Sequence, residues 1–189
     1  MEQNEKTKKD KILNEVISIL KIVVFSFAFV YLMQSFFFKP IQVEGNSMYP
    51  TLHDNDVGFT NVFTRNVNGI QRFDIVIVYV PASDKYLVKR VVGLPGETIY
   101  YSQNKLYVNG QYVEENFFDE NYVNEFMASI DGYFTSDVES ITLGSNEYFL
   151  LGDNRRISSD SRRFGPFTGD QIIGKGVFIF FPLNHFRIR

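Results

Sequence analysis

The sequence contains no cysteine and no tryptophan, and only two of its 189 residues are histidine. Without cysteine the chain has no disulfide, no thiol nucleophile and no thiolate metal ligand. Two histidines also argue against a histidine-rich metal centre. We therefore expect no metal site, and a folded part that is stabilised by packing alone.

The chain also lacks an excess of positive charge. Its formal net charge is -3 and its pI is about 5.4, so no basic field would attract a polyanion, and nucleic acid is not an expected partner. Twenty phenylalanines and eleven tyrosines indicate a strand-rich domain, because aromatic side chains suit half-buried pleated surfaces. Setting aside the apolar N-terminal segment leaves roughly 150 residues, enough for one domain.

One long apolar run stands near the N-terminus. Residues 22–38 read IVVFSFAFVYLMQSFFF without a charge, which as a helix would span roughly 25 Å. Extension back to Ile17, with Lys21 reaching toward the lipid headgroups, gives about twenty residues and a plausible bilayer crossing. The run is longer than most signal-peptide cores and lacks a small-x-small cleavage site. We predict a transmembrane anchor over residues 17–38 rather than a cleaved signal or a buried core helix.

The lysines around this run predict its direction. Five lie before it or at its start, whereas Lys39 is the only lysine or arginine within about twenty residues after it. The five are Lys6, Lys8, Lys9, Lys11 and Lys21. We therefore expect residues 1–16 to be a cytoplasmic tail and residues 39–189 to be extracytoplasmic. Ser47 is eight residues beyond Lys39, within roughly 25 to 30 Å of the membrane interface even on an extended chain, so a membrane-bound substrate could reach it.

After the anchor, alternating or continuous apolar stretches bounded by glycine and proline predict strands. An Asn109-Gly110 pair between two alternating stretches predicts a hairpin. The region from about 114 to 140 shows no clear periodicity and indicates a cap or insertion. The expected strands are residues 41–44, 73–80, 86–92, 106–113 with the hairpin turn inside, 147–151 and 176–181.

Three polar motifs lie among these strands. Residues 45–51 read GNSMYPT, residues 89–97 read KRVVGLPGE, and residues 152–162 read GDNRRISSDSR. Singly, each has an ordinary explanation: a turn, a lysine at a strand edge, and a solvated loop. Together, a serine on a Gly-Asn turn and a lysine in an apolar run are what a nucleophile activated by an amine requires.

In this order and spacing the motifs resemble those of type I signal peptidases, especially the single-anchor forms typical of Gram-positive bacteria. The resemblance implies a mainly β fold: a coiled antiparallel β domain with a small inserted β cap, at about residues 104–142, preceded by one N-terminal transmembrane helix. It also implies a membrane-bound serine endopeptidase that removes signal peptides from exported preproteins without a cofactor. Its partners would be signal peptides and the lipid bilayer.

The resemblance assigns Ser47 as the nucleophile and Lys89 as the general base. It assigns Ser158 to hydrogen-bond the lysine amine, Asp160 and Arg162 to a structural ion pair, and Asp153 to a supporting role. The chemistry needs a neutral amine, yet a lysine of pKa about 10.4 is neutral in about one molecule in 2,500 at pH 7. Lowering that pKa by about three units requires roughly 4 kcal/mol of differential desolvation, which the apolar neighbours of Lys89 could supply.

Two positions depart from the pattern. Gly45 stands where some members have a serine whose hydroxyl stabilises the oxyanion, so the Ser47 backbone N–H would carry more of that role. Arg156 stands where many members have an acidic or small polar residue, which changes the local charge. No proposed catalytic position is altered.

Substrate binding follows from the predicted strands. An extended peptide could pair between the strand that ends near residues 43–45 and residues 86–88, with alternate side chains entering small apolar pockets. The family prefers alanine-like residues one and three positions before the cut. Candidate pocket residues, which could equally be plain core, are Val43, Met48, Leu52, Leu87 and Val88.

Two further functions are compatible with parts of the sequence. A serine hydrolase with His53 or His185 as its base is one; substituting both histidines would test it, because a Ser-Lys enzyme should still cleave. A non-enzymatic anchored β module is the other, although it does not explain the joint occurrence of the three motifs. Self-cleaving repressors of the DNA-damage response also use Ser and Lys, but they would need a DNA-binding region where this chain has an anchor.

Overall fold

The structure is a computed structural model that describes residues 2–36, 38–62, 69–129 and 132–188. The chain divides into two compact units, Met1–Phe38 and Lys39–Arg189.

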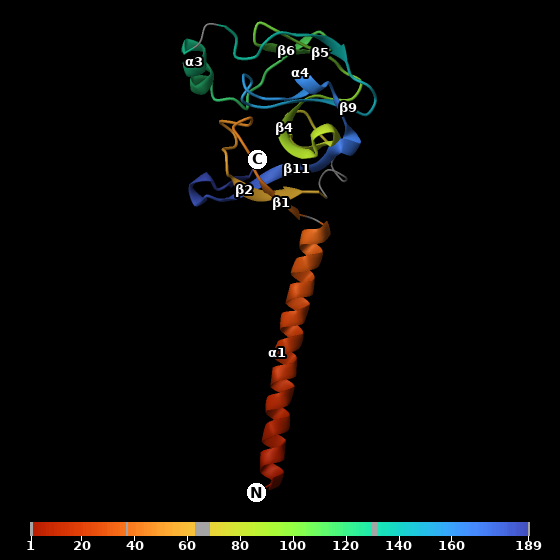
Figure 1. Cartoon of the computed structure of the whole chain (residues 1–189), viewed down its shortest axis with the longest axis vertical. Coiled ribbons are helices and arrows are strands. Elements are labelled where there is room, and N and C mark those ends of the chain that lie inside the picture. Colours follow the sequence, from red (N-terminus) through yellow and green to blue (C-terminus); the bar gives the residue numbers. More distant parts are fainter. Residues whose placement is uncertain (1, 37, 63–68, 130–131, 189) are drawn as a thin grey trace. The chain divides into compact units, whose positions relative to one another are not determined.

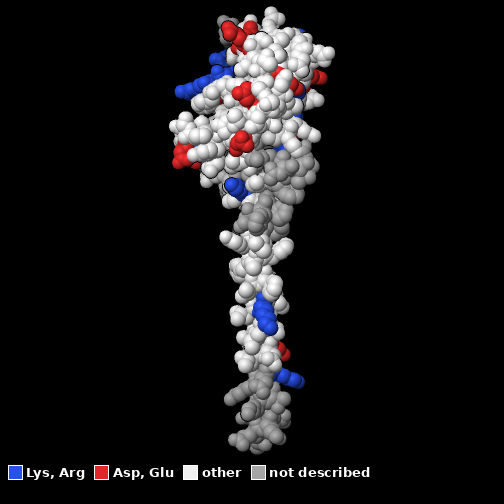
Figure 2. All heavy atoms as spheres, turned by 90° about the vertical axis from the view of Figure 1, so that its right-hand side faces the viewer, with Lys and Arg blue, Asp and Glu red and all other residues white. Residues whose placement is uncertain are grey.

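The first unit is the helix α1, which runs without interruption from Glu2 to Phe36 (Figure 1). Within it, Lys11–Leu32 is long and apolar enough to cross a membrane. These side chains are exposed, as they must be if lipid is to cover them. After Lys21, α1 carries no Lys, Arg, Asp or Glu, and the described part of this stretch is white in Figure 2. The helix begins well before the predicted anchor of residues 17–38.

The second unit contains a main sheet whose strands follow the order β1-β2-β11-β3-β4-β9-β10, with β12 added beside β11. From β2 to β10 neighbouring strands pair antiparallel. The strands are β1 (Phe38–Gln42), β2 (Val57–Asn61), β3 (Ile75–Val80), β4 (Lys85–Gly93), β9 (Glu147–Leu151), β10 (Phe167–Thr168), β11 (Ile172–Phe181) and β12 (Arg187–Ile188).

A second, four-stranded sheet has the order β7-β6-β5-β8 and lies with α3 at one end of this unit, opposite β2 and β11 (Figure 1). It spans residues 98–142, a range that includes the predicted inserted region. Its elements are β5 (Thr98–Ser102), β6 (Lys105–Val108), β7 (Gln111–Val113), α3 (Glu120–Ala128) and β8 (Val138–Thr142). The described part of the unit also contains short helices: η1 (Pro81–Ser83), α4 (Ser161–Phe164), η2 (Gly169–Gln171) and η3 (Leu183–His185).

The mainly β architecture with one N-terminal apolar helix confirms the predicted fold class. The hairpin forms between β6 and β7, where Asn109 and Gly110 both have positive φ values of 50° and 79°. Such a pair suits the right-handed twist of the flanking strands. Several strand limits differ from the prediction. For example, β1 ends at Gln42 instead of continuing to residue 44, and β11 begins at Ile172, four residues earlier than expected.

Three apolar clusters form the core of the second unit. One lies between the second sheet and β9, around Ile99, Leu106 and Phe149. Another joins the chain after β1 to β3 and β11, and a third joins β3, β4 and β9. The second cluster is the one that matters for the site, because it anchors the segment that carries Ser47.

Candidate active site

Ser47 lies in the segment of residues 43–56 between β1 and β2, here called the Ser47 loop. Its base is closed by two backbone hydrogen bonds, from Val43 N to the oxygen of Asp56 at 2.8 Å and from Asn55 N to the oxygen of Val43 at 2.9 Å. Gly45 has a φ of 75°, a left-handed conformation that favours glycine, and starts the turn. Met48 and Leu52 are fully buried, so the loop is pinned into the core immediately beside Ser47.

Lys89 reaches Ser47 from the middle of β4. Its amine nitrogen Nζ lies 2.8 Å from Ser47 Oγ and 2.9 Å from the Val88 carbonyl oxygen. The lysine is only 1% exposed, although an unpaired lysine is almost never buried. The predicted pair is therefore in hydrogen-bond contact in an interior environment.

Burial lowers the pKa of Lys89 from 10.5 to about 8. The carboxylates of Asp160 and Asp153 oppose this shift, and Arg162 assists it. At a pKa of about 8, about one molecule in ten carries a neutral amine at pH 7. The direction agrees with the need for a neutral base, and desolvation is the cause expected from the sequence.

The loop that follows β9 packs directly on the Ser47 main chain. Asn154 N donates to the Ser47 carbonyl oxygen at 3.0 Å. A Cβ atom on Gly152 would lie 2.4 Å from that oxygen and 2.2 Å from Ser158 Oγ, closer than real Cβ contacts. Only glycine fits here, so the loop is placed against the nucleophile with little room to move.

Two buried carboxylates hold this loop. Asp153 accepts from Arg90 Nε at 2.8 Å and from an Arg90 terminal nitrogen at 2.6 Å. Asp160 accepts from Arg162 at 2.9 and 2.8 Å and from Gly152 N at 3.1 Å. Burial alone would raise the pKa of Asp160, but the Arg162 and Gly152 bonds outweigh it and leave the pKa below its usual value. The expected Asp160–Arg162 ion pair is thus present, and Arg90 points away from Lys89 toward Asp153.

A third buried ion pair, like that of Arg90 with Asp153, was not predicted from the sequence. Arg155 is bound to Glu115 in two places and also donates to Thr135 Oγ1 at 2.9 Å and to Tyr101. These partners belong to the second sheet and its connections, so Arg155 joins that region to the loop beside Ser47. No local pattern could reveal it, because Glu115 is 40 positions away in a region without periodicity.

Ser158 is beside the pair but does not bind the amine. In the part of the chain that the structure describes, the Lys89 amine donates to Ser47 and Val88 alone. The Ser158 hydroxyl is buried and meets no partner at hydrogen-bond geometry, although it is near enough to Asp160 to help lower that carboxyl's pKa. The predicted contact with Lys89 is therefore not formed here.

Four of the five candidate pocket residues share one cluster. Val43, Met48 and Leu52 are buried together, and the half-buried Val88 packs against them. Leu87, which precedes Val88 on β4, packs instead against the third core cluster, on the opposite face of the strand. The structure thus separates Leu87 from the other four.

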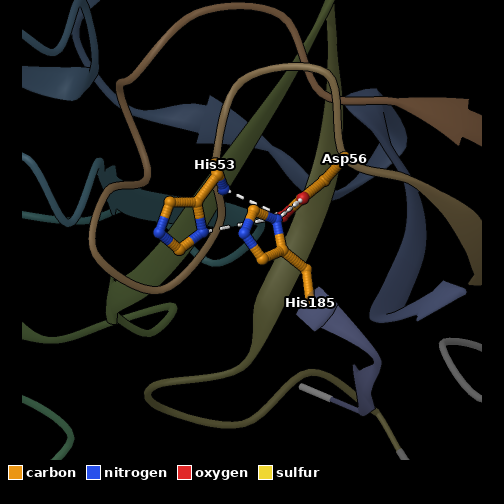
Figure 3. A group of neighbouring side chains, drawn as sticks. All are labelled: His53, Asp56 and His185. Carbon is orange, nitrogen blue, oxygen red and sulfur yellow. Dashed lines mark hydrogen bonds and ion pairs between the residues drawn. The ribbon is translucent and has the colours of Figure 1, made fainter. Parts of the chain in front are cut away.

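The two histidines lie together, and neither forms a hydrogen bond with Ser47 or Lys89 among the described residues. His53 and His185 stack with ring centroids 4.4 Å apart, and both approach the buried Asp56 (Figure 3). Their ligand atoms and that of Asp56 lie within 4.8 Å of one another, close enough for a metal ion. A cation is already there, however: an Arg187 nitrogen lies 2.8 Å from His53 Nδ1 and 3.6 Å from Asp56 Oδ2.

Comparison with known proteins identifies the family of this chain. The model of the family described as signal peptidase, peptidase S26, matches residues 16–181. Signal peptidase I S of Bacillus subtilis is 38% identical over 88% of this chain and 90% of its own length. A signal peptidase I of Bacillus amyloliquefaciens is 36% identical over 98% and 97%. A solved signal peptidase I from Enterococcus faecalis, 34% identical, covers 56% of this chain and 95% of its own, with a TM-score of 0.48.

The chain therefore belongs to the S26 family of signal peptidases, which confirms the resemblance carried by the three motifs. Members of this family are hydrolases. Together with the apolar helix α1, membership identifies a membrane-anchored enzyme.

Proposed function

We propose that this chain cleaves signal peptides from exported preproteins, with Ser47 as the nucleophile and Lys89 as the general base. One observation carries the assignment of the pair: a buried lysine amine lies 2.8 Å from a serine hydroxyl, with a pKa lowered by burial. No histidine contacts Ser47 among the described residues, which favours this pair over a Ser-His hydrolase.

In the proposed reaction the neutral Lys89 amine takes the Ser47 proton as Oγ attacks the carbonyl carbon of the scissile peptide bond. The protonated amine then gives this proton to the leaving nitrogen, and the mature protein departs with a free amino group. The signal peptide remains as an ester on Ser47. A water molecule, deprotonated by the same amine, hydrolyses the ester and restores the serine.

The oxyanion of this reaction needs backbone donors. Gly45 has no hydroxyl to offer, and its N–H already donates to Asp54 Oδ1 at 2.7 Å. We assign the N–H of Ser47 itself as the principal donor. The Gly152–Arg162 loop would then act indirectly, by fixing the Ser47 main chain through Asn154 and Gly152.

The exposed edge of β4 supplies the means to bind an extended peptide. Residues 85–90 pair with β3 on one side, whereas on the other side β9 pairs only with Arg90 and residues beyond it. The backbone of residues 85–89 therefore has an open edge beside Lys89, among the described strands. A signal-peptide segment added there would place its alternate side chains over Val88 and its apolar neighbours. Val43, Met48 and Leu52 would set the floor of a pocket for small side chains, with Leu87 on the far face.

We further propose that the N-terminus is cytoplasmic and that the unit from Lys39 onward is extracytoplasmic. The lysine distribution around α1 supports this orientation. The absence of cysteine makes a direct test possible: single-cysteine variants Lys8→Cys and Lys105→Cys can be labelled in intact cells with a membrane-impermeant thiol reagent. Labelling at position 105 alone supports the orientation, and labelling at position 8 alone reverses it.

The activity is tested by incubating the full chain in detergent with a preprotein that carries an Ala-x-Ala boundary, and by locating the cut by mass spectrometry. Wild type should cut after the second alanine, and folded Ser47→Ala should not. Wild type that binds the preprotein but never cuts it would support the anchored binding module instead.

A further inference from the structure

A cluster of polar side chains connects the C-terminal end of the described chain to the Ser47 loop. At its centre is Asp56, whose side chain is 0% exposed. One carboxylate oxygen accepts from His53 N at 2.9 Å, and the other accepts from His185 Nδ1 at 2.6 Å (Figure 3). Because Asp56 also closes the base of the Ser47 loop through its backbone, the cluster lies at the point where that loop is fixed.

Arg187 completes the cluster from β12. One terminal nitrogen donates to His53 Nδ1 at 2.8 Å, and its Nε donates to the His185 carbonyl oxygen at 3.1 Å. A guanidinium can only donate, so His53 must accept at Nδ1 and is therefore neutral, with its proton on Nε2. Burial and then the charge of Arg187 lower the pKa of His53, which is consistent with the neutral form.

The Arg187 guanidinium thus places a positive charge beside Asp56 and the two histidines, where a metal cation could otherwise bind. A buried carboxylate without a charged or hydrogen-bonded partner is costly, so the cluster depends on Arg187 and His185. Arg187 lies on β12, which pairs with β11 of the main sheet, with Arg187 opposite Ile179. The cluster therefore links the Ser47 loop through β12 to β11, which also pairs with β2 and β3.

From His53 the contacts continue to the nucleophile. The His53 ring meets the Tyr49 ring edge to face, with centroids 5.2 Å apart, and Tyr49 is two residues after Ser47. Ser47 and Lys89 belong to separate elements, so their 2.8 Å contact depends on the placement of the whole loop. A displacement of about 1 Å in such a contact can reduce a rate by about a hundredfold.

We propose that Arg187 is a positioning residue, which acts through His53 to hold the Ser47 loop at the distance from Lys89 that proton transfer requires. The inference rests on the proposed roles of Ser47 and Lys89. It gives Arg187 and β12 an indirect part in the reaction, through the placement of Ser47.

The test compares Arg187→Met and His53→Leu with two controls. His53→Asn keeps an acceptor oxygen close to the position of Nδ1, and Lys105→Met removes an exposed cation from the second sheet. All are assayed as full-length chains, well below the unfolding temperature of the least stable variant. We expect kcat to fall about tenfold in Arg187→Met and His53→Leu with KM changed less than about twofold, because the loop is loosened rather than the peptide site removed. Lys105→Met should stay close to wild type. His53→Asn keeps the acceptor for Arg187 but loses the ring that contacts Tyr49, so its kcat should lie between those of wild type and His53→Leu.

The double variant and hydrogen exchange separate positioning from simple stability. The loss in Arg187→Met/His53→Leu should be no greater than in either single variant, because the two residues form one link. Backbone amides of residues 46–55 should exchange faster in Arg187→Met, while those of β9 should not change. Folded Arg187→Met and His53→Leu with wild-type kcat would overturn the proposal, even if both unfold at lower temperature. Activity retained by Ser47→Ala would instead show that the proposed nucleophile is wrong.

Discussion

The dependence of cleavage on pH gives a quantitative test of the lysine base. With a pKa of about 8, Lys89 is neutral in about 1% of molecules at pH 6, about 9% at pH 7 and about 91% at pH 9. Only the neutral form can accept the Ser47 proton, so activity must be lost as pH falls through about 8. We expect kcat/KM to rise about tenfold from pH 6 to 7 and about tenfold again from pH 7 to 9.

Replacing a neighbouring charge should move this profile in a known direction. The Asp160 carboxylate is the largest of the charges that raise the pKa of Lys89. In Asp160→Asn that charge is lost while Arg162 remains, so the inflection should move to lower pH than in wild type. The variant's fold must be checked first, because Asp160 also binds Gly152 and Arg162.

The assay uses a peptide with alanine one and three positions before the cut and no group that ionises between pH 6 and 10, in micelles of a neutral detergent. The enzyme is preincubated at each pH and returned to pH 8, which shows whether any loss is reversible. An inflection between pH 6 and 6.5 would indicate a histidine base and refute the reasoning. A rise that continues tenfold per unit beyond pH 9 would show that burial does not shift the amine.

Three other substitutions test separate parts of the structure. Lys89→Met should stabilise the fold by about 3 kcal/mol at pH 7 in urea unfolding, because the charged amine is disfavoured when buried. The folded pKa of about 8 lies below the unfolded value of 10.5, so wild type regains this stability as pH rises across that interval. A less stable variant at pH 7 would contradict the account. Gly152→Ala should reduce kcat about a hundredfold while the chain still folds, because the alanine Cβ would displace Ser158 or the Ser47 carbonyl. An unchanged kcat would exclude the close packing of Gly152 on Ser47. Arg155→Met should cost about 3 to 5 kcal/mol of unfolding free energy by leaving Glu115 buried without its partner, and a loss under about 1 kcal/mol would show that Glu115 is solvated.

Local patterns predicted the elements whose shape depends on near neighbours. Residues 147–151 form β9 within the predicted limits, and the Asn109-Gly110 pair forms the predicted hairpin turn. The helix α3 was not predicted, because the apolar residues of 114–140 follow no regular period and the helix buries no residue fully. A short helix that packs only partly leaves too weak a pattern to detect.

For the site, too, some contacts could be predicted from the sequence and others could not. Ser47 and Lys89 could be predicted together because their motifs identify a family, and not because anything local joins positions 42 residues apart. The Arg155–Glu115 pair and the link from Arg187 to His53 could not be predicted. In the sequence alone these charged residues are typical of an ordinary surface, because their partners become neighbours only in the folded chain. Ser158 shows the limit of reasoning from resemblance: its neighbourhood was right, but its contact with the amine is not formed.

The central claim is that the Lys89 amine activates Ser47. Its most direct test is the cleavage rate of an Ala-x-Ala preprotein by Lys89→Met beside wild type and Ser47→Ala, with each fold verified by circular dichroism. We predict that both folded variants lose activity by at least about a thousandfold, because neither can generate the nucleophile. Lys89→Met that cuts at the same boundary within about tenfold of wild type would contradict the account and reopen the assignment of the base.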